Sequence, residues 1–249
     1  MSSQLSLNHI RHALARLEET IIFGLIERSQ FCRNEIIYQK GGVGRELKEE
    51  SLVEFLLHES ERSHAKVRRY TSPDEYPFFN DLPEPILPQL DFENPLHPNA
   101  VNLNREIKQA YESEIVPFIC APGDDRQWGS SAVNDVMLLQ ALSKRIHYGK
   151  FVAEAKYRSQ PAVFDSSIRA GDRISLMAAI TNQPLEQEVL NRVHRKAATY
   201  GQELSSTPGP FKVDPSAVHD IYSRWIIPLN KKVQVEYLLV RLQASLASS

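Results

Sequence analysis

The chain has 249 residues, of which 42% are hydrophobic and 24% charged, and its formal net charge is −2. A chain of this length can bury a sizeable core, and its near-neutral charge excludes the electrostatic pattern of proteins that bind nucleic acid or anionic membranes. The two cysteines, Cys32 and Cys120, lack metal-ligand spacing and are typical of a reduced, intracellular protein rather than of a disulfide scaffold.

The N-terminal region shows no targeting pattern. Charged residues recur throughout 1–19, where a signal peptide needs an unbroken apolar run, and the apolar stretch 20–26 is too short to span a bilayer. Helical spacing begins close to the N-terminus, which leaves no room for a transit peptide. We therefore expect a cytoplasmic protein with no nucleic-acid partner and no membrane partner.

The chain shows helical periodicity over most of its length. Glycine is scarce, at 10 of 249 residues, and the first periodic segment, 6–32, carries apolar residues at helical spacing from Leu7 to Leu25. The pattern predicts an all-α fold, a single-domain bundle of long helices with additional short helices over residues 1–249. The other periodic segments are, in chain order, 47–70, 102–118, 131–158, 163–180, 184–201 and 215–246.

Residues 72–98, which we call the strap, contain seven of the fifteen prolines. Proline excludes a continuous helix here. Apolar residues between the prolines predict an ordered segment packed on the bundle rather than a flexible linker. Loops are expected at 120–131 and 205–215, and Asp214-Pro215 has the pattern of a helix N-cap followed by proline at the first helical position. The apolar residues of the strap are Phe78, Phe79, Leu82, Ile86, Leu87 and Phe92.

Arg145 and Lys156 interrupt the apolar face of the segment 131–158. Positions 142, 145, 149, 152 and 156 step by three or four residues, so both cations lie on the face that a core helix fills with apolar side chains. Their Cα atoms are expected about 16 Å apart along the helix axis. The pair can hold a small anion, or each cation can form an ion pair with an acidic neighbour, because a buried unpaired cation is too costly.

Other helical segments also carry polar residues in or beside an apolar stripe. Arg11 flanks the apolar face of 6–32, Asn182 and Glu186 are spaced i and i+4, and so are Asn230 and Gln234. Each of these residues alone is typical of a solvated or hydrogen-bonded group. Together they predict a polar, cation-rich pocket inside a helical bundle. The sequence contains no nucleophile elbow, no histidine pair at metal spacing and no phosphate-binding loop.

Four stretches together resemble the all-helical chorismate mutases of fungi and plants: IRHALARLEETIIFGLIER (10–28), SPDEYPFF (72–79), LSKRIHYGKFVAEAKY (142–157) and VQVEYLLVRL (233–242). The resemblance extends over nearly the whole chain. It implies a homodimer that converts chorismate to prephenate, on the route to phenylalanine and tyrosine, without a metal ion or a cofactor. It also implies that the two cations face a dicarboxylate substrate.

The resemblance assigns roles to the pocket residues. Arg11 and Arg145 would hold the two carboxylates of chorismate, and Lys156 would reach a carboxylate and the ether oxygen whose bond breaks. Asn182 and Glu186 would hold the ring hydroxyl.

Two positions of the last helical segment depart from the pattern of the fungal enzymes. Gln234, which would donate to the ether oxygen from the other side, stands where fungal enzymes have Glu and plant-like relatives have Gln. Asn230 stands where the family usually has Thr, so we expect an altered substrate affinity. The alternatives are a catalytically weak relative that binds aromatic amino acids as a regulatory protein, and a helical scaffold whose buried charges are ion pairs.

The resemblance also implies an effector site in a cleft between two subunits. Arg68 and Arg69 match the pair that grips a tyrosine or tryptophan effector in the family, and Gln127, Gly129 and Ser130 match the facing loop and helix N-terminus. The alternative for the arginine pair is a favourable interaction with the C-terminal end of a helix dipole.

Two of the effector positions differ from the fungal pattern. Val133 replaces a Thr that reads the tyrosine hydroxyl, and Gln127 replaces an Asn. We therefore expect an amino-acid effector site in which inhibition by tyrosine is reduced or lost.

Overall fold

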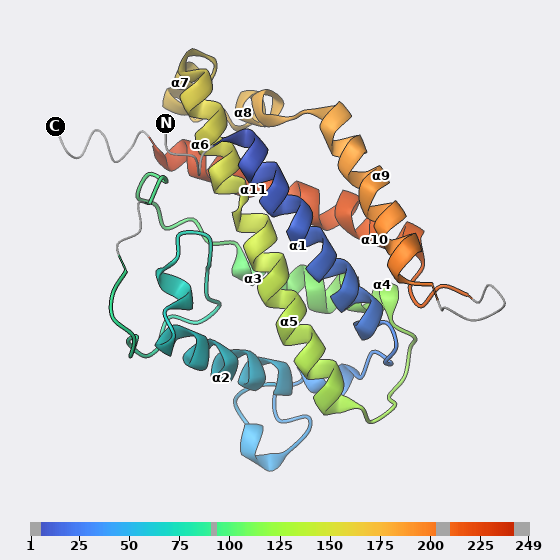
Figure 1. The fold of residues 1–249 in the computed structure, drawn as a ribbon. Helices are drawn as coiled ribbons and strands as arrows, with labels where there is room; N and C mark the ends of the chain where they lie inside the picture. The colour runs from blue at the N-terminus through green and yellow to red at the C-terminus, as the bar shows by residue number, and fades with distance from the viewer. Residues whose placement is uncertain (1–5, 91–93, 203–209, 242–249) are drawn as a thin grey trace.

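The computed structural model describes residues 6–90, 94–202 and 210–241, and over these residues the chain forms helices and connecting segments without a β-strand. Two long helices, α1 (Leu7–Arg28) and α5 (Trp128–His147), cross the middle of the molecule side by side (Figure 1). No described helix is both long enough and apolar enough to cross a membrane. The all-α fold expected from the periodicity is confirmed, whereas the single domain over 1–249 stays a prediction.

The remaining helices surround this central pair. Short 3-10 turns lie at η2 (Glu35–Tyr38), η3 (Arg45–Leu47) and η4 (Arg69–Thr71), and π-helical turns at η5 (Tyr111–Ile115) and η6 (Tyr222–Ile226). The other α-helices are α2 (Leu52–Lys66), α3 (Asn104–Ala110), α4 (Val116–Ile119), α6 (Gly149–Ser159), α7 (Pro161–Ala170), α8 (Arg173–Ile180), α9 (Gln183–Tyr200), α10 (Pro215–Ile221) and α11 (Ile227–Arg241).

The start of α1 and its contact with α5 follow from local sequence. The Ser6 side chain accepts a hydrogen bond from the His9 N–H at 3.1 Å, which caps the helix. A Cβ atom at Gly24 would lie 2.7 Å from Cδ2 of Leu138, so the close approach of α1 to α5 at this point requires glycine. Ile21 and Leu25 are fully buried on either side of it.

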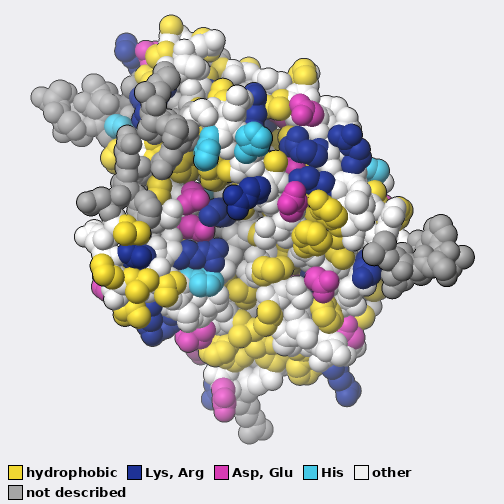
Figure 2. All heavy atoms as spheres, viewed as in Figure 1, with side chains coloured by type: hydrophobic (Ala, Val, Ile, Leu, Met, Phe, Trp, Pro, Cys, Tyr) yellow, Lys and Arg dark blue, Asp and Glu magenta, His cyan; other side chains and the backbone are white. Residues whose placement is uncertain are grey.

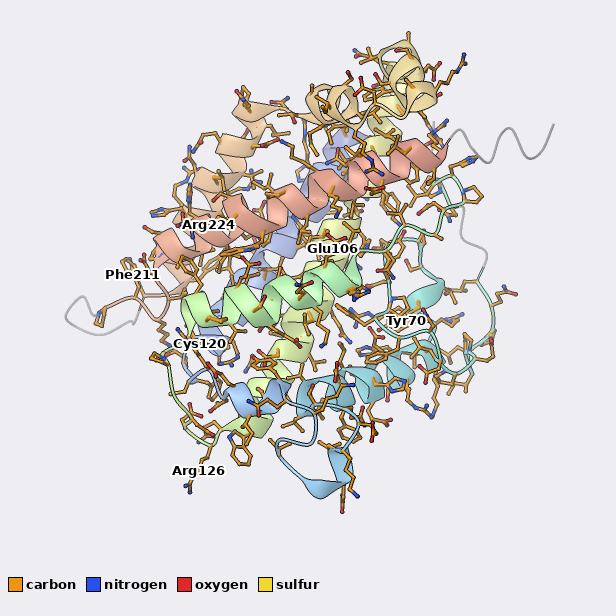
Figure 3. All side chains as sticks on the ribbon, turned by 180° about the vertical axis from the view of Figure 1, so that it is seen from behind. Tyr70, Glu106, Cys120, Arg126, Phe211 and Arg224 are labelled. Carbon is orange, nitrogen blue, oxygen red and sulfur yellow. The ribbon has the colours of Figure 1, made fainter. Side chains whose placement is uncertain are left out.

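The rear of the molecule is formed by α11 and the α3–α4 segment, which run alongside each other (Figure 3). Side-chain contacts join the two: Lys232 pairs with Glu106 at 2.7 Å, and Trp225 Nε1 donates to Glu114 at 2.9 Å. α10, η6 and α11 form one continuous run, as the pattern over 215–246 predicts, and its expected end lies outside the described residues. Asp214 caps α10 as predicted, accepting from the Ser216 N–H at 2.8 Å.

Two of the predicted helical segments are interrupted. The segment 131–158 is broken at Tyr148 into α5 and α6, and 163–180 is broken at Gly171 into α7 and α8. Gly171 has a φ of 65°, a left-handed conformation that ends α7, and the Asp172 side chain then caps α8. Apolar periodicity continues across both breaks, so it did not reveal them.

The described parts of the strap pack on the bundle near both ends, where Leu96 is buried in the second core cluster, but not in the middle. Phe78 and Phe79 contact the main core, and their N–H groups donate to the buried Glu61 carboxylate of α2 at 2.9 and 3.1 Å. The expectation is wrong for Ile86 and Leu87, whose side chains are 74% and 40% exposed. This region is held through its main chain, by a hydrogen bond from the Ile86 N–H to the Lys66 oxygen at 2.9 Å, which leaves the side chains free. Phe92 lies outside the described residues.

The segment that follows the strap is fixed to the α5–α6 junction by a lysine that is fully buried. Lys150 Nζ donates to Asn99 Oδ1 at 2.8 Å and to the Val101 oxygen, and it lies 3.8 Å from the ring centre of Tyr76. No carboxylate within the described part of the chain pairs with it. Burial therefore lowers the pKa of Lys150 to about 7.

We expect Lys150→Met to destabilise the protein more at alkaline than at neutral pH. Between the folded pKa of about 7 and the unfolded value of 10.5, the unfolded chain binds more protons, so the native protein gains stability as pH rises through this window. The Met variant lacks this gain and loses the hydrogen bonds to Asn99 Oδ1 and to the Val101 oxygen, at a cost of about 1–3 kcal/mol. Urea denaturation across the window measures the difference.

Lys144→Met is the matched control, because Asp74 and Glu75 pair with Lys144 and its pKa is raised rather than lowered. Its effect should be constant across the same pH window. A Lys150→Met effect that is equally constant would contradict the assignment.

Candidate active site

A cavity of about 240 Å³ lies where the two hydrophobic clusters of the core meet. Its walls come from α1, α5, α6, α9 and α11, and from the segment that joins α8 to α9. The structure brings together all the residues that the sequence placed in one polar pocket. These residues are Arg11, Arg145, Lys156, Asn182, Glu186, Asn230 and Gln234. Residues spaced i and i+4 lie on one face of a helix, so each pair points into the same cavity.

Arg145 is the deepest cation of the cavity. Its side chain projects from α5 and the residue is 5% exposed. Among the described residues no carboxylate lies within ion-pair distance, and its buried Nε has no hydrogen-bond acceptor. Burial lowers the pKa of the guanidinium below its usual value, and Tyr222 and Glu18 offset this only in part. The ion pair considered as an alternative is therefore not formed.

Lys156 lies on the same wall, one helix further along the chain. Its Nζ donates to the Ile180 oxygen, at the end of α8. Burial lowers the pKa of Lys156 to about 8; Glu186 raises it, and the nearby Lys231 and Arg11 lower it. Arg145 and Lys156 thus share one face across the break between α5 and α6, as their eleven-residue spacing predicts.

The break between α5 and α6 is where α11 comes closest. A Cβ atom at Gly149 would lie 2.7 Å from the Asn230 oxygen and 2.9 Å from its Nδ2. Asn230 Nδ2 donates to the Ile146 oxygen at 2.9 Å and to the Arg145 oxygen at 3.3 Å. Gln234 Nε2 in turn donates to Asn230 Oδ1 at 2.9 Å. The uncharged amides of Asn230 and Gln234 therefore line the cavity from α11, joined to each other and to the end of α5.

Three predicted residues lie at the mouth of the cavity. Arg11 and Asn182 are exposed, and Glu186 is partly exposed. Asn182 caps α9, its Oδ1 accepting from the Leu185 N–H at 3.1 Å, so only its NH₂ group is free to bind a ligand. Glu186 pairs with Lys231 at 3.1 Å.

Sequence reasoning missed Lys231, which lines the same cavity. The sequence could indicate that Lys231 lies near the cavity, because it precedes Gln234 by three residues on one helix. The identity of its partner was not visible, because Glu186 lies on another helix.

Sequence reasoning also missed the buried carboxylate that joins two walls of the cavity. Glu18 of α1 is fully buried and accepts from Arg192 at 2.7 Å and from Lys196 at 3.3 Å, both on α9. The contact holds the helix of Arg11 against the helix of Glu186. The spacing indicates that Glu18 lies on the same face of α1 as Arg11, because it follows Arg11 by two helical turns. Its partners could not be predicted, because they lie more than a hundred residues away along the chain.

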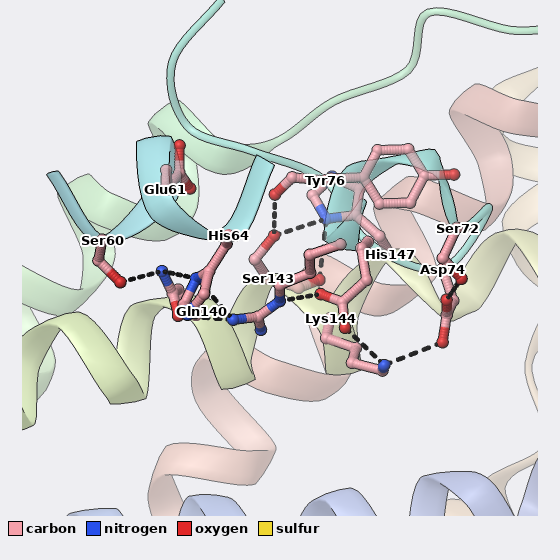
Figure 4. A network of polar contacts seen from close by, with 12 residues as sticks. Ser60, Glu61, His64, Ser72, Asp74, Tyr76, Gln140, Ser143, Lys144 and His147 are labelled. Carbon is pink, nitrogen blue, oxygen red and sulfur yellow. Dashed lines mark hydrogen bonds and ion pairs between the residues drawn. The ribbon is translucent and has the colours of Figure 1, made fainter. Parts of the chain in front are cut away.

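The predicted effector residues are not brought together within one chain. Arg69, in η4, donates to Gln140 Oε1 at 2.9 Å and to Glu75 at 3.1 Å, and Figure 4 shows the polar network that it joins. Arg68 donates to the Pro88 oxygen. Ser130 lies ten residues before Gln140 on α5, which is about 15 Å along the helix axis. Gln127 and Gly129 are exposed beside it.

Among the described residues, no cluster of His, Cys, Asp and Glu side chains is arranged to hold a metal ion. The histidine nearest the cavity walls, His147 of α5, is a structural residue. Its Nε2 accepts from the Leu103 N–H at 2.9 Å, and burial lowers its pKa to about 3.

Comparison with known proteins identifies close relatives. The model of the family described as chorismate mutase type II matches residues 129–235. The chorismate mutase of Schizosaccharomyces pombe is 47% identical over 247 residues, which cover 97% of this chain and 98% of that protein. Chorismate mutase 1, chloroplastic, of Petunia hybrida is also 47% identical, over 95% of this chain and 76% of that protein.

The solved structures agree. The crystal structure of a Candida albicans chorismate mutase in complex with L-Trp superimposes with a TM-score of 0.91 at 41% identity, covering 96% of this chain and 92% of that one. A plant enzyme with tyrosine bound in its allosteric site superimposes with a TM-score of 0.89 at 46% identity, covering 97% and 98%.

We expect Gly149→Ala to separate α6 from α11 and to raise KM for the substrate. The added Cβ would meet backbone as well as side-chain atoms of Asn230, so the helices must shift, at a cost of about 1–3 kcal/mol in stability. Thermal denaturation and steady-state kinetics measure the two effects.

Gly129→Ala is the control, since an added Cβ there has no atom within 4 Å. This variant should be unchanged or up to about 1 kcal/mol more stable. Equal behaviour of the two variants would show that the contact with Asn230 does not constrain the cavity.

Proposed function

Because the chain belongs to the chorismate mutase family, we propose that it rearranges chorismate to prephenate and that the cavity between α1, α5, α6, α9 and α11 is its active site. The observation that carries the proposal is the buried Arg145, which has no carboxylate partner in the described chain and shares its cavity with Lys156. A dicarboxylate substrate supplies the negative charge that this wall lacks. Burial of the cation is tolerable only with such a partner.

The reaction requires no nucleophile and no proton transfer, since one ether bond breaks while a carbon–carbon bond forms within one molecule. The first contribution of the enzyme is to hold the compact conformer in which the two carbon atoms meet, which is worth several kcal/mol. In our assignment Arg11 at the mouth and Arg145 in the depth bind one carboxylate each. Their separation on two helices, α1 and α5, sets the conformer that fits.

The second contribution is electrostatic. Negative charge develops on the ether oxygen as its bond lengthens, and fixed donors aimed at this atom stabilise the transition state more than the substrate. We assign Lys156 to one side of the ether oxygen and the Gln234 amide to the other. Glu186 and the NH₂ group of Asn182 are assigned to the ring hydroxyl, with Lys231 holding the Glu186 carboxylate in place.

The alternative of a relative that has lost turnover rests on Asn230 alone. In the structure this amide is bound to two main-chain oxygens and to Gln234, and it does not replace or block any of the cations. The geometry therefore favours the enzyme over an effector-binding protein without activity.

We also propose a homodimer with an amino-acid effector site between its subunits. Apolar side chains of α1 and α5 are exposed on one face, namely Phe23 at 50%, Val133 at 61% and Met137 at 40%. Figure 2 shows hydrophobic side chains gathered on this face, with basic and acidic side chains mixed above them. A second chain placed here would cover the apolar side chains, and it could supply the half of the effector site that one chain does not bring together.

Cellular location is a separate matter. We keep the expectation of a cytoplasmic protein as a proposal, since the relatives include chloroplastic plant enzymes as well as fungal ones.

Arg145→Ala should lower kcat/KM for chorismate several hundredfold, corresponding to the loss of about 3 kcal/mol of transition-state stabilisation. The loss of chorismate absorbance measures turnover, and circular dichroism checks that the helices are intact. Lys144→Ala, one residue away on the other face of α5, should change kcat/KM less than about threefold. An Arg145→Ala variant as active as the parent would place the active site elsewhere.

The pH profile should reflect Lys156. The ammonium is the active form, so kcat/KM should be level between pH 5 and about 7, fall to about half near the pKa of about 8, and decline further above it. Gln234 does not titrate, and therefore adds no loss on the acid side. The fall in kcat should come at higher pH than the fall in kcat/KM, because a bound dianion stabilises the ammonium. A steep loss between pH 5 and 8 with an intact fold would contradict both roles.

Tyrosine should inhibit weakly or not at all, because Val133 offers no hydrogen bond to its hydroxyl. Titration of tyrosine and of tryptophan into the turnover assay measures their effects, and Val133→Thr should restore sensitivity to tyrosine. Strong micromolar inhibition of the parent chain by tyrosine would refute this expectation.

A further inference from the structure

We propose that Asn230 is a positioning residue. It determines that the NH₂ group of the Gln234 amide, and not its oxygen, points toward the reacting ether oxygen. The proposal rests on the proposed function, because it assumes that Gln234 donates to the substrate. It differs from the role implied by the resemblance, in which Asn230 belongs to the substrate-binding residues. Here Asn230 acts through its neighbour.

The first step concerns the orientation of the Asn230 amide. Its Nδ2 lies 2.9 Å from the Ile146 oxygen and 3.3 Å from the Arg145 oxygen, at the end of α5. Main-chain oxygens can only accept hydrogen bonds, so the NH₂ group must face them. The opposite orientation would set Oδ1 against two acceptors in a place that is 9% exposed. Asn230 Oδ1 is therefore turned away from α5 and toward Gln234.

The second step concerns Gln234. Asn230 Oδ1 is an acceptor, so the group opposite it must donate, and Gln234 Nε2 lies 2.9 Å away. The orientation of Gln234 is thus dictated by that of Asn230, and ultimately by two carbonyl groups of α5. Gln234 Nε2 has a second hydrogen, which is the donor available to a ligand. In the described chain no partner binds its buried Oε1.

The third step is why this control is needed. An amide has one donating and one accepting end of nearly equal shape, and only the donating end stabilises negative charge on an ether oxygen. If Gln234 turned over, its Oε1 would face the developing charge and oppose the reaction. Asn230 prevents this turn, because it would place two acceptor oxygens against each other. The i, i+4 spacing on α11 brings the two amides within reach.

The fourth step is the room that the arrangement requires. Asn230 reaches the α5 carbonyls only because Gly149 has no side chain: a Cβ there would come within 2.9 Å of Nδ2. The glycine at the helix break, the asparagine and the glutamine therefore act as one unit. Of these three residues, only Gln234 is assigned to touch the substrate.

The experiment is a double-mutant cycle in turnover, with Asn230→Ala, Gln234→Ala and the double variant. We expect Asn230→Ala to lower kcat about tenfold or more while KM changes much less, since a free Gln234 amide spends time in the wrong orientation. In the Gln234→Ala background the same substitution should have little further effect on kcat. Effects that multiply independently would overturn the proposal and leave Asn230 with a structural role only.

A pH profile gives a second readout that a structural role would not move. With Gln234→Glu, the protonated carboxyl has one hydrogen to donate, which goes to Asn230 Oδ1 in the free enzyme and to the ether oxygen when the substrate binds. Activity needs this proton, so kcat/KM should fall as pH rises between 5 and 8. Adding Asn230→Ala removes the acceptor that favours the protonated form. The midpoint of the fall should then move to lower pH by about one unit or more. An unchanged midpoint would overturn the proposal.

Two controls make the outcome of the experiment interpretable. If Asn230→Ala does not fold, Asn230→Ser replaces it, because serine leaves a smaller cavity and is still too short to reach Gln234. The parent chain and Arg145→Ala are measured alongside. Inactivity of the parent chain would contradict the proposed function, whereas an active parent with independent effects at 230 and 234 would contradict only the positioning role.

Discussion

The burial of the Arg145 guanidinium, which has no carboxylate partner among the described residues, is the constraint on which the rest of the site depends. A protein normally surrounds such a group with acceptors, because removing a cation from water is costly. Here the cost is accepted within an otherwise well-packed core: Ile146, the next residue of α5, is 1% exposed, and α1 and α5 approach so closely that Gly24 has no room for a side chain. In the proposed active site this buried positive charge would make the binding of a dianion favourable.

The surrounding helices are held together by ion pairs that lie away from the cavity, so these pairs do not compete with the ligand for the cavity cations. Glu18 satisfies Arg192 and Lys196 at the junction of α1 and α9, and Glu154 binds Arg241 at 2.8 Å and the Tyr237 hydroxyl at the junction of α6 and α11. These carboxylates face helix junctions rather than the cavity. The cavity side of the same helices carries cations and amides, with one carboxylate, Glu186, that is paired with Lys231. This polarity suits a substrate with two carboxylates and a transition state with charge on oxygen.

The sequence revealed more of the site than of the helix ends, and for physical reasons. A cation in an apolar stripe is visible from spacing alone, so the sequence places Arg145 and Lys156 on one face. The break at Tyr148 could not be predicted, because apolar periodicity runs through it and the reason for it, contact between Gly149 and Asn230, joins distant parts of the chain. Lys231 and Glu18 were missed for the same reason. The exposed Ile86 and Leu87 show that apolar residues in a proline-rich segment can be held by hydrogen bonds to the main chain rather than by burial of their side chains.

The central claim is that Arg145 and Lys156 form a binding site for a dianion. Calorimetric titration of a bicyclic dicarboxylate analogue of the transition state tests it most directly, with the parent chain, Arg145→Ala and Lys156→Ala. The account predicts tight binding to the parent, a raised Tm in its presence, and loss of both in each variant. A parent chain that does not bind the analogue, or variants that bind it equally well, would show that the two cations serve the fold and not the substrate.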